Sequence, residues 1–586
     1  MKKNYVILFF VSFCLMSVAQ DLPAGWGEGE KEKMPFYLEQ IKNNNLQNKN
    51  LIVTPPPHTK LRNAAEWEEI QTLVITWTSY TAIHREIILA AQQETKITII
   101  CSDSNVVKTN LTTNSVPLTN LKFIIAPYNS VWMRDYFGNT VYAANVDTLL
   151  LVDWVYNRPR PLDDAVPTVV ANSYSIPIYE TKTSPWDLIH TGGNYMSDGF
   201  GTAFSSQLTD NENTNHSAAY IDTIMKKFMG INRYIRFPVL PFDGIHHIDM
   251  HMKLLDEETL LVGEYPVGTA DGPQIEANLQ YILSNYTSVF GTPYKVVRIP
   301  MPKDKNNKWP NQSGGWYCTY TNGVFVNKTY IFPTFYQQYD TTAFRILKQS
   351  LPGYKVVGID CDNGTSPIIS ASGAIHCITH SIGAKDPLLI SHQNHVNDCD
   401  TANYLIKARI LHKTGIASAT LFWTIDTLLG YNQTNMSLVN AQNGDYSANI
   451  PAQMAGKTVY YYISSTSTSG KTITRPITAP LGRFTFKVLA CANISSIKEN
   501  NVIKLKPIYP NPASFITCIP LVSNNSQDVK VSLINLLGET LDIIYEGEIS
   551  QGEKNVFFHA ENYPKGVYFI EVKTASNSVV QKLLIR

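Results

Sequence analysis

Ser372-Gly-Ala-Ile-His-Cys-Ile-Thr379 is the stretch around which the chain is organised, because it sets Cys377 behind small residues that would let a substrate approach closely. A lone cysteine in an apolar run is more often a buried packing residue. We nevertheless interpret Cys377 as a nucleophile, since a single cysteine with a distant histidine is a candidate for covalent catalysis. This interpretation depends on the residues that precede it in the chain.

The residues between Leu73 and this stretch alternate between two hydrophobic patterns. Short β-branched runs predict buried strands, and apolar residues spaced three and four apart predict helices. This alternation indicates one α/β catalytic domain, which we bound at residues 55–388. The predicted strands are 73–77, 97–101, 121–125, 149–152, 259–262 and 295–299, and the predicted helices are 82–92, 218–229, 274–283 and 342–351.

Length and composition exclude some classes of protein. The 586 residues exceed one ordinary core, so we expect roughly three or four domains plus processed segments. Lys+Arg and Asp+Glu are equal at 48 each, which leaves no net charge to attract nucleic acid or an anionic membrane. The 32 Tyr and 23 Phe suit strand-rich extracellular folds and peptide or sugar contacts.

The N-terminus predicts export. Residues 1–20 begin with Met-Lys-Lys and continue with an apolar run too short to span a bilayer, which is typical of a secretory signal peptide. Cys14 follows the large Phe13, so we expect no lipid anchor there. Residues 21–54 are rich in Lys, Glu, Asn and Pro and predict an exposed leader, or pro-segment, open to trimming.

The cysteine count favours one reactive thiol. All but one of the eight cysteines follow the signal peptide, and an odd number in an exported protein leaves at least one unpaired. Their scattered spacing offers no CxxC metal framework. The pairing of the others is not specified by the sequence. These residues are Cys101, Cys318, Cys361, Cys377, Cys399, Cys491 and Cys518.

After residue 388 the helical periodicity ends and short strand patterns repeat, at 404–411, 418–423 and 458–464 among others. Residues 389–490 therefore predict an immunoglobulin-like β-sandwich, followed by a polar linker at 491–505. Residues 506–586 contain Tyr509-Pro-Asn-Pro512 and Lys565-Gly-Val-Tyr-Phe569, a pattern similar to the C-terminal sorting domains of the type IX secretion system of Bacteroidetes. The alternative is a further small all-β sandwich.

His247-Ile-Asp-Met-His251 alternates polar with apolar residues. In a strand, His247, Asp249 and His251 would share one face and His246 would lie on the other. An HxDxH run also permits a zinc site, but no further ligands stand at suitable spacing. A surface strand with hydrogen-bonded histidines is the remaining alternative.

Five motifs follow one another along residues 55–390, and the second of them places Asp135 just after a predicted strand, where α/β sites collect. The motifs are Ala65-Glu-Trp-Glu-Glu69, Trp132-Met-Arg-Asp135, His247-Ile-Asp249, Tyr320-Thr-Asn-Gly323 and Gly373-Ala-Ile-His-Cys377. Together they resemble the guanidine-modifying enzymes, in particular the agmatine deiminases and the bacterial, Porphyromonas-type peptidylarginine deiminases. The resemblance implies a fivefold pseudosymmetric α/β propeller.

The resemblance also implies a role for each site residue. A guanidinium is planar, cationic and a poor electrophile, so a catalyst must hold it between carboxylates and attack it with a thiolate. Asp135 and Asp249 would form the clamp, and Cys377 would be the nucleophile. His247 would protonate the leaving ammonia and then activate water. Asn322 would hydrogen-bond near the cysteine.

Substrate choice is suggested by Arg158 and Arg160, which lie in a run that its prolines hold extended. Two guanidinium groups one residue apart can converge on one carboxylate, although exposed loop charges are the alternative. By resemblance they would bind the carboxylate of a C-terminal arginine, with Trp132 also in the substrate site. His376 is expected to point away from the site.

The resemblance thus implies a secreted or cell-surface deiminase that converts peptide arginine, preferably C-terminal, to citrulline and ammonia through a thiouronium intermediate. We expect no required cofactor and no catalytic metal, with room for a structural calcium ion. The expected partners are arginine-containing peptides or proteins and the outer-membrane secretion machinery, and we expect a monomer. The alternatives are an agmatine or free-arginine deiminase, a cysteine peptidase using Cys377, His247 and Asn322, and a non-enzymatic surface-binding protein.

Overall fold

The computed structural model describes residues 22–47, 54–335, 337–400, 402–490, 503–535, 538–575 and 578–586. The chain divides into two compact units, residues 1–490 and 491–586. The predicted signal peptide at residues 1–20 lies outside the described residues. Within the described ranges, no helix combines the length and apolar character that crossing a membrane requires.

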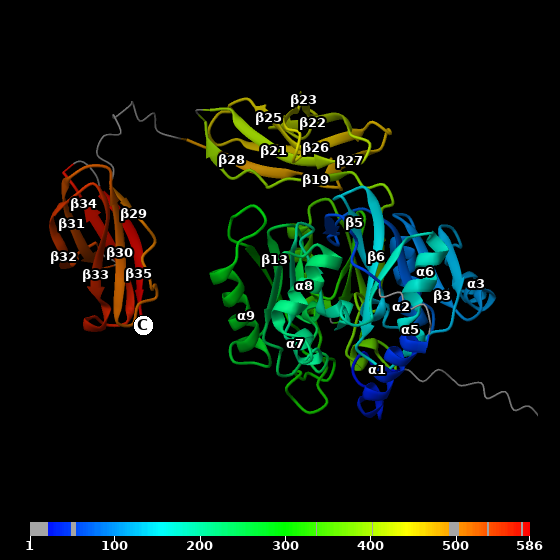
Figure 1. The fold of residues 1–586 in the computed structure, drawn as a ribbon. Coiled ribbons are helices and arrows are strands. Elements are labelled where there is room, and N and C mark those ends of the chain that lie inside the picture. The colour runs from blue at the N-terminus through cyan, green and yellow to red at the C-terminus, as the bar shows by residue number, and fades with distance from the viewer. Residues whose placement is uncertain are drawn as a thin grey trace, which may run out of the picture. The chain divides into compact units, whose positions relative to one another are not determined.

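Residues 61–383 form five sheets that repeat one pattern (Figure 1). In each sheet a central strand has an antiparallel neighbour on one side. On its other side lies a parallel neighbour, and a helix connects the central strand to this neighbour along the chain. A parallel pair needs such a crossover connection, which explains the alternation in the sequence. The late strand β18 pairs with β2, His380 opposite Val74, and thereby joins the last repeat to the first.

The first sheet contains, in spatial order, β18 (His380–Gly383), β2 (Ile70–Thr76), β3 (Lys96–Cys101) and β4 (Leu121–Ile125), and the second contains β1 (Leu61–Asn63), β5 (Asn139–Ala143), β6 (Thr148–Tyr156) and β7 (Ile178–Thr181), with β8 (Ile189–His190) beside β6. The third contains β11 (Arg233–Phe237), β10 (Thr202–Ser206) and β9 (Met196–Ser197), and the fourth contains β12 (Met252–Leu254), β13 (Thr259–Glu264) and β14 (Lys295–Pro300). The fifth contains β15 (Val324–Val326), β16 (Thr329–Thr334) and β17 (Lys355–Asp360). The crossover helices are α2 (Thr81–Ala91), α6 (Val166–Tyr174), α8 (Ala218–Met229), α9 (Gly272–Asn285) and α10 (Gln337–Ser350). The other helices are α1 (Glu30–Gln47), α3 (Ser104–Thr113), α4 (Met133–Tyr136), α5 (Pro161–Asp164) and α7 (Leu208–Glu212), with the 3-10 turns η1 (Gly192–Asn194), η2 (Ile248–Met250) and η3 (Ile368–Ala371).

Local signals explain why the helices form where the periodicity predicts them. Helix α8 has the predicted bounds, and it begins after Ser217, whose side chain accepts a hydrogen bond from the backbone N–H of Tyr220. It ends at Gly230, which has a positive φ of 72° and lets the chain turn. Its buried residues lie three and four positions apart and face the core: Ile221, Ile224, Met225, Phe228 and Met229.

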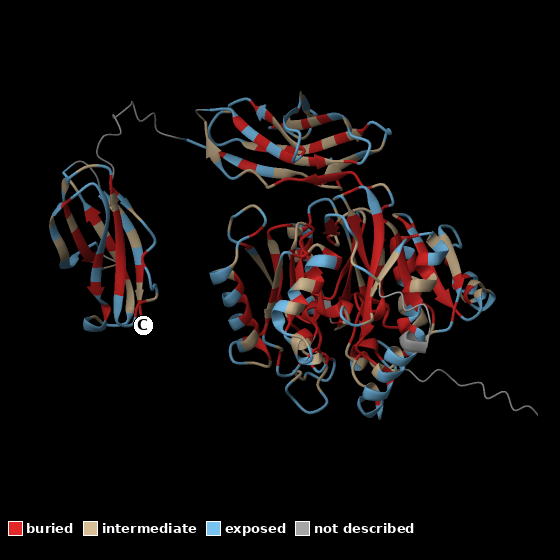
Figure 2. Ribbon diagram, in the orientation of Figure 1, coloured by how far each residue is buried: buried red, intermediate tan, exposed pale blue. Residues whose placement is uncertain are grey.

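Residues 389–489 form two further sheets around one shared core. Burial alternates along strands such as β26, so one face packs inward and the other faces solvent (Figure 2). One sheet contains β19 (Leu389–Ser391), β21 (Tyr404–Leu411), β25 (Asp445–Ile450) and β24 (Ser437–Asn440). The other contains β20 (Asp398–Cys399), β28 (Phe484–Leu489), β26 (Thr458–Ser467), β22 (Ile416–Thr424), β23 (Asn432–Asn435) and β27 (Thr472–Arg475).

The second unit is all-β in its described residues, apart from the 3-10 turn η4 (Ala560–Asn562). Its two sheets share a separate hydrophobic core that includes Ile519, Val531 and Ile570. One sheet contains β29 (Ile503–Leu505), β30 (Ile516–Ser523) and β33 (Gly552–His559), and the other β32 (Thr540–Ile549), β31 (Gln527–Ile534), β34 (Gly566–Lys573) and β35 (Ser578–Ile585).

Two expectations about exposure hold only in part. Helix α1 lies within the segment predicted as an exposed leader, and much of it is exposed, but Ala24, Glu30 and Tyr37 are buried. Strands β4 and β14 are mostly half-buried, whereas both were expected to be buried. Apolar runs predict a strand but do not say how completely neighbouring elements cover it.

Candidate active site

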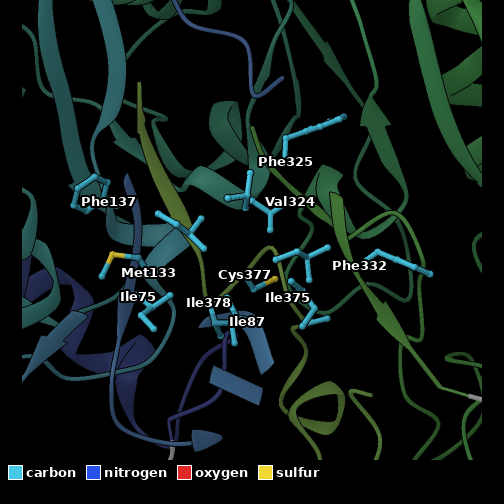
Figure 3. Packing of buried hydrophobic residues seen from close by; sticks show 14 of the residues in the cluster. Ile75, Ile87, Met133, Phe137, Val324, Phe325, Phe332, Ile375, Cys377 and Ile378 are labelled. Carbon is cyan, nitrogen blue, oxygen red and sulfur yellow. The ribbon is translucent and has the colours of Figure 1, made fainter. Parts of the chain in front are cut away.

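Cys377 lies in the hydrophobic core and is fully buried, beside Ile375 and Ile378 (Figure 3). It is one of five free cysteines among the described residues, which confirms that an unpaired thiol is present. Its surroundings differ from those of a simple packing residue. Its Sγ accepts a hydrogen bond from Nδ2 of Asn322 at 3.2 Å and lies 3.9 Å from Oδ2 of Asp249.

Asn322 holds the cysteine loop in two ways. Besides the bond from Nδ2 to the thiol, its Oδ1 accepts a hydrogen bond from the backbone N–H of His376 at 3.0 Å. Asn322 is fully buried two residues before β15, a strand of the core. The expected hydrogen bond near the cysteine is therefore present.

His247 and Asp249 reach the site from a different local structure than expected. The predicted strand is wrong, because Ile248–Met250 form the 3-10 turn η2. Thr321 stabilises this turn by donating its hydroxyl to the backbone oxygen of Asp249 at 2.9 Å. Nδ1 of His247 lies 3.5 Å from Oδ1 of Asp135, and Asp249 is beside the cysteine.

Asp135 lies on the single-turn helix α4 and is buried. The backbone N–H of Arg134 donates to the carbonyl of Cys377 at 3.0 Å, which fixes this turn against the cysteine loop. Burial, followed by the negative charge of Asp249, raises the pKa of Asp135 to about 7. Two carboxylates thus face one small region beside the thiol.

Five buried polar atoms of Asp135, Asp249 and His247 have no hydrogen-bond partner within the described part of the chain. They are both carboxylate oxygens of Asp135, Oδ1 of Asp249, and Nδ1 and Nε2 of His247. Leaving such atoms unpaired in a protein interior costs roughly 1–3 kcal/mol each, and more for charged groups. A planar cation with several N–H donors is the kind of ligand that these carboxylate oxygens would accept.

Burial also sets the protonation of the thiol and the imidazole. It raises the pKa of Cys377 well above its ordinary value, and the charges of Asp249 and Asp135 raise it further. Burial lowers the pKa of His247 to about 3. At neutral pH the protein by itself therefore holds a thiol and a neutral imidazole, and a cation between the carboxylates would favour the thiolate.

His376 does not point away from the site, contrary to expectation. Its Nδ1 lies 2.7 Å from Oδ2 of Asp249, and its Nε2 lies 2.8 Å from Oε1 of Glu66. Both contacts are hydrogen bonds when each ring nitrogen carries a proton. His376 therefore connects Asp249 to a second buried carboxylate.

Glu66 is the centre of this supporting network. It contacts Lys253 and lies 3.3 Å from Nη1 of Arg134. Although burial acts against ionisation, the charges of His376, Lys253 and Arg134 hold the pKa of Glu66 well below its ordinary range. The sequence indicated Glu66 only through its motif, and nothing in the sequence indicated Lys253.

Gly193 is a site residue that the sequence interpretation missed. It lies in η1, and a Cβ added to it would come within 2.4 Å of Nδ1 of His247 and 2.9 Å of Oδ1 of Asp135. Only glycine leaves both side chains in place. The Gly192-Gly193 pair between predicted elements was the available signal.

The predicted substrate residues are near the carboxylates but are covered. Trp132 is buried, and its Nε1 donates to the carbonyl of Leu22 at 2.7 Å. Arg158 and Arg160 are also buried, and both charges lower the pKa of Asp135 against the larger effect of burial. The alternative that they are exposed loop charges is wrong.

Among the described residues, no group of three or more His, Cys, Asp or Glu side chains is placed so that it could hold a metal ion. The expectation of no required cofactor, with room for structural calcium, stays a prediction.

Two parts of the chain match known protein families. Residues 62–382 match the family of Porphyromonas-type peptidyl-arginine deiminases, and residues 507–586 match the secretion system C-terminal sorting domain. A provisionally named agmatine deiminase of Legionella pneumophila is 25% identical over 44% of this chain and 75% of its own length. The agmatine deiminase of Medicago truncatula is 22% identical over 54% of this chain and 94% of its own length. The solved C. jejuni agmatine deiminase is 20% identical, with a TM-score of 0.45 over 55% of this chain and 95% of that one.

The family match and the curated relatives define a deiminase, an enzyme class that hydrolyses amidine groups. The chain belongs to the Porphyromonas-type peptidyl-arginine deiminase family. Its C-terminal sorting domain engages the type IX secretion machinery, so the protein is secreted or displayed at the cell surface of a Bacteroidetes-type bacterium.

Proposed function

We propose that this protein hydrolyses the guanidinium group of peptide arginine, giving peptide citrulline and ammonium. The observation that carries the proposal is the pair of buried carboxylates, Asp135 and Asp249, with unpaired oxygens beside the thiol of Cys377. A guanidinium supplies the positive charge and the N–H donors that these oxygens lack. Membership of the deiminase family supports the same assignment.

The proposed mechanism uses five side chains. The bound guanidinium offsets the charges of Asp135 and Asp249, so the pKa of Cys377 falls and His247 takes the thiol proton. Sγ attacks the guanidinium carbon, and His247 returns the proton to the nitrogen that leaves as ammonia. The resulting thiouronium is attacked by a water whose proton passes to His247, and collapse of the adduct releases citrulline and the thiolate. Asn322 keeps Sγ in place through its 3.2 Å hydrogen bond.

We further propose that Arg158 and Arg160 give a preference for arginine at a peptide's C-terminus. Each is buried near Asp135, and Nε of Arg158 and Nη1 of Arg160 lack partners among the described residues. Two guanidinium groups so placed suit an α-carboxylate. The second candidate is an agmatine deiminase, which the names of the relatives favour. Agmatine has no carboxylate for these arginines.

The test of this proposal compares three substrates: a peptide ending in free arginine, its amide and agmatine. We expect the free acid to be turned over best, and the Arg158→Ala/Arg160→Ala variant to lose about tenfold to a hundredfold in kcat/KM on it. The rate on the amide should barely change. Arg85→Ala, which removes a half-buried hydrogen bond to Asn110, is the control. Equal wild-type rates on acid and amide would refute the carboxylate preference, and ammonia from agmatine alone would favour the second candidate.

Gly193→Ala should reduce kcat/KM by roughly tenfold to a hundredfold, because the new Cβ displaces the imidazole of His247 and the carboxylate of Asp135. Gly244→Ala is a matched control, since a Cβ there meets nothing within 4 Å. Circular dichroism would establish that both variants fold. Normal activity of folded Gly193→Ala would contradict the assigned roles of His247 and Asp135.

Three architectural features remain proposals. The five βαβ repeats and the pairing of β18 with β2 support a fivefold propeller. The two sheets with a shared core support an immunoglobulin-like sandwich at residues 389–490. We also propose a monomer that needs no cofactor.

A further inference from the structure

The chain's own residues 22–30 lie on the predicted substrate subsite. Their sequence is Leu-Pro-Ala-Gly-Trp-Gly-Glu-Gly-Glu. Nε of Arg160 is 2.8 Å from Oε1 of Glu30, and Nη2 is 2.9 Å from Oε2. The ring of Trp26 packs on the guanidinium of Arg158, with 4.4 Å between the ring centroid and Cζ. Both arginines of the pair are therefore engaged by this segment.

The neighbouring residues also bind the segment through its main chain. Trp132 donates to the carbonyl of Leu22 at 2.7 Å, and Nη2 of Arg160 donates to the carbonyls of Pro23 and Gly25 at 2.8 and 3.1 Å. The backbone N–H of Ala24 donates to the carbonyl of Ala371 at 3.0 Å. Main-chain hydrogen bonds of this kind recognise a peptide whatever its side chains are.

The contacted residues belong to the active site's own loops. Trp132 is three residues from Asp135, and its ring packs against Gly373, where a Cβ would come within 2.3 Å of Cζ3. Ala371 ends η3, just before the cysteine loop. The segment contains neither arginine nor lysine, so it offers no guanidinium to the carboxylates.

We propose that Trp132, Arg158 and Arg160 form a peptide-binding subsite and that residues 22–30 occupy it as an internal competitor, with the Glu30 carboxylate where a substrate's carboxylate would bind. The proposal rests on the proposed function, since it names how that site is regulated. A tethered segment acts at an effective concentration of the order of millimolar. A substrate must displace it, so the apparent dissociation constant is the intrinsic one divided by the fraction of molecules in which the segment has left the subsite.

The kinetic test uses the full chain with Glu30→Gln and Trp26→Ala combined. We expect KM for a peptide ending in free arginine to fall by about tenfold, with kcat changed less than about twofold. Glu32→Gln is the control, because it lies in the same first turn of α1 and is exposed. Unchanged KM in the folded double variant would overturn the proposal.

A binding test separates this proposal from the proposed function. In a Cys377→Ala background, which requires no turnover, a labelled synthetic peptide of residues 22–30 should bind the Glu30→Gln/Trp26→Ala protein at least about tenfold more tightly than the protein with its own segment intact. Equal binding of the peptide to the two proteins would refute occupancy of the subsite by residues 22–30. Absence of ammonia release by the wild type and by the Glu30→Gln/Trp26→Ala protein that retains Cys377, with this difference in binding preserved, would refute the proposed function alone.

Discussion

Replacing Cys377 with alanine should reduce ammonia release from arginine substrates by more than about a thousandfold, because no other group near the carboxylates can form the thiouronium. The fold should persist, since the change removes one buried sulfur atom and leaves no new unpaired charge. Ammonia release and the melting temperature of the purified protein would be measured together.

Cys101→Ala provides a matched control. Cys101 is also a buried free thiol, at the end of β3, so its loss tests the effect of removing a core sulfur. We expect this variant to retain activity. A folded Cys377→Ala variant with near-normal turnover would rule out covalent catalysis by this residue.

Asp135→Asn should lower kcat/KM by roughly 30-fold to several thousandfold, equivalent to about 2 to 5 kcal/mol of lost interaction with the guanidinium charge. The substitution keeps the shape of the side chain. Asp249→Asn should have an effect of the same order, and it should also weaken the contact with His376. Asp222→Asn, at a half-exposed surface pair with Arg236, is the control.

The pH dependence of Asp135→Asn gives a second test. The pKa of Asp135 is raised to about 7, so in the wild type kcat/KM should rise as the pH increases through this value and the carboxylate ionises. This rise should be absent in Asp135→Asn. The carboxyl of Asp135 binds its proton more tightly in the folded protein than in the unfolded chain. The free energy of unfolding that Asp135 contributes therefore decreases as the pH rises from 3.8 to about 7, and Asp135→Asn should lack this decrease. Identical pH profiles of kcat/KM for the wild type and Asp135→Asn would show that Asp135 does not bind the guanidinium.

Where the sequence prediction succeeded, the information was local. Helix α8 and strand β21 have the predicted bounds, because apolar spacing and the residues at their ends specify them. The order of five short motifs likewise indicated the family, which residues 62–382 confirm. The C-terminal motifs indicated the sorting domain that the match at 507–586 confirms.

Where the prediction failed, a tertiary contact decided the outcome. Polar alternation fitted a strand at 247–251, yet Thr321 holds the backbone there in a 3-10 turn. His376 was expected to point away, but Glu66 and Asp249 attract both of its nitrogens. Polar composition predicted an exposed leader, whereas Arg160 and Trp132 hydrogen-bond to Glu30 and Leu22 in it.

The sequence by itself determined several of the elements, such as α8 and β21, together with the family and the identity of the candidate nucleophile, because periodicity and short motifs depend on neighbouring residues. Only the tertiary structure decided which charged groups meet. Glu66 and His376 are 310 positions apart, and Glu30 and Arg160 are 130 apart. Such contacts depend on how the five sheets bring distant loops together, and on the high free-energy cost of leaving a buried charge unpaired.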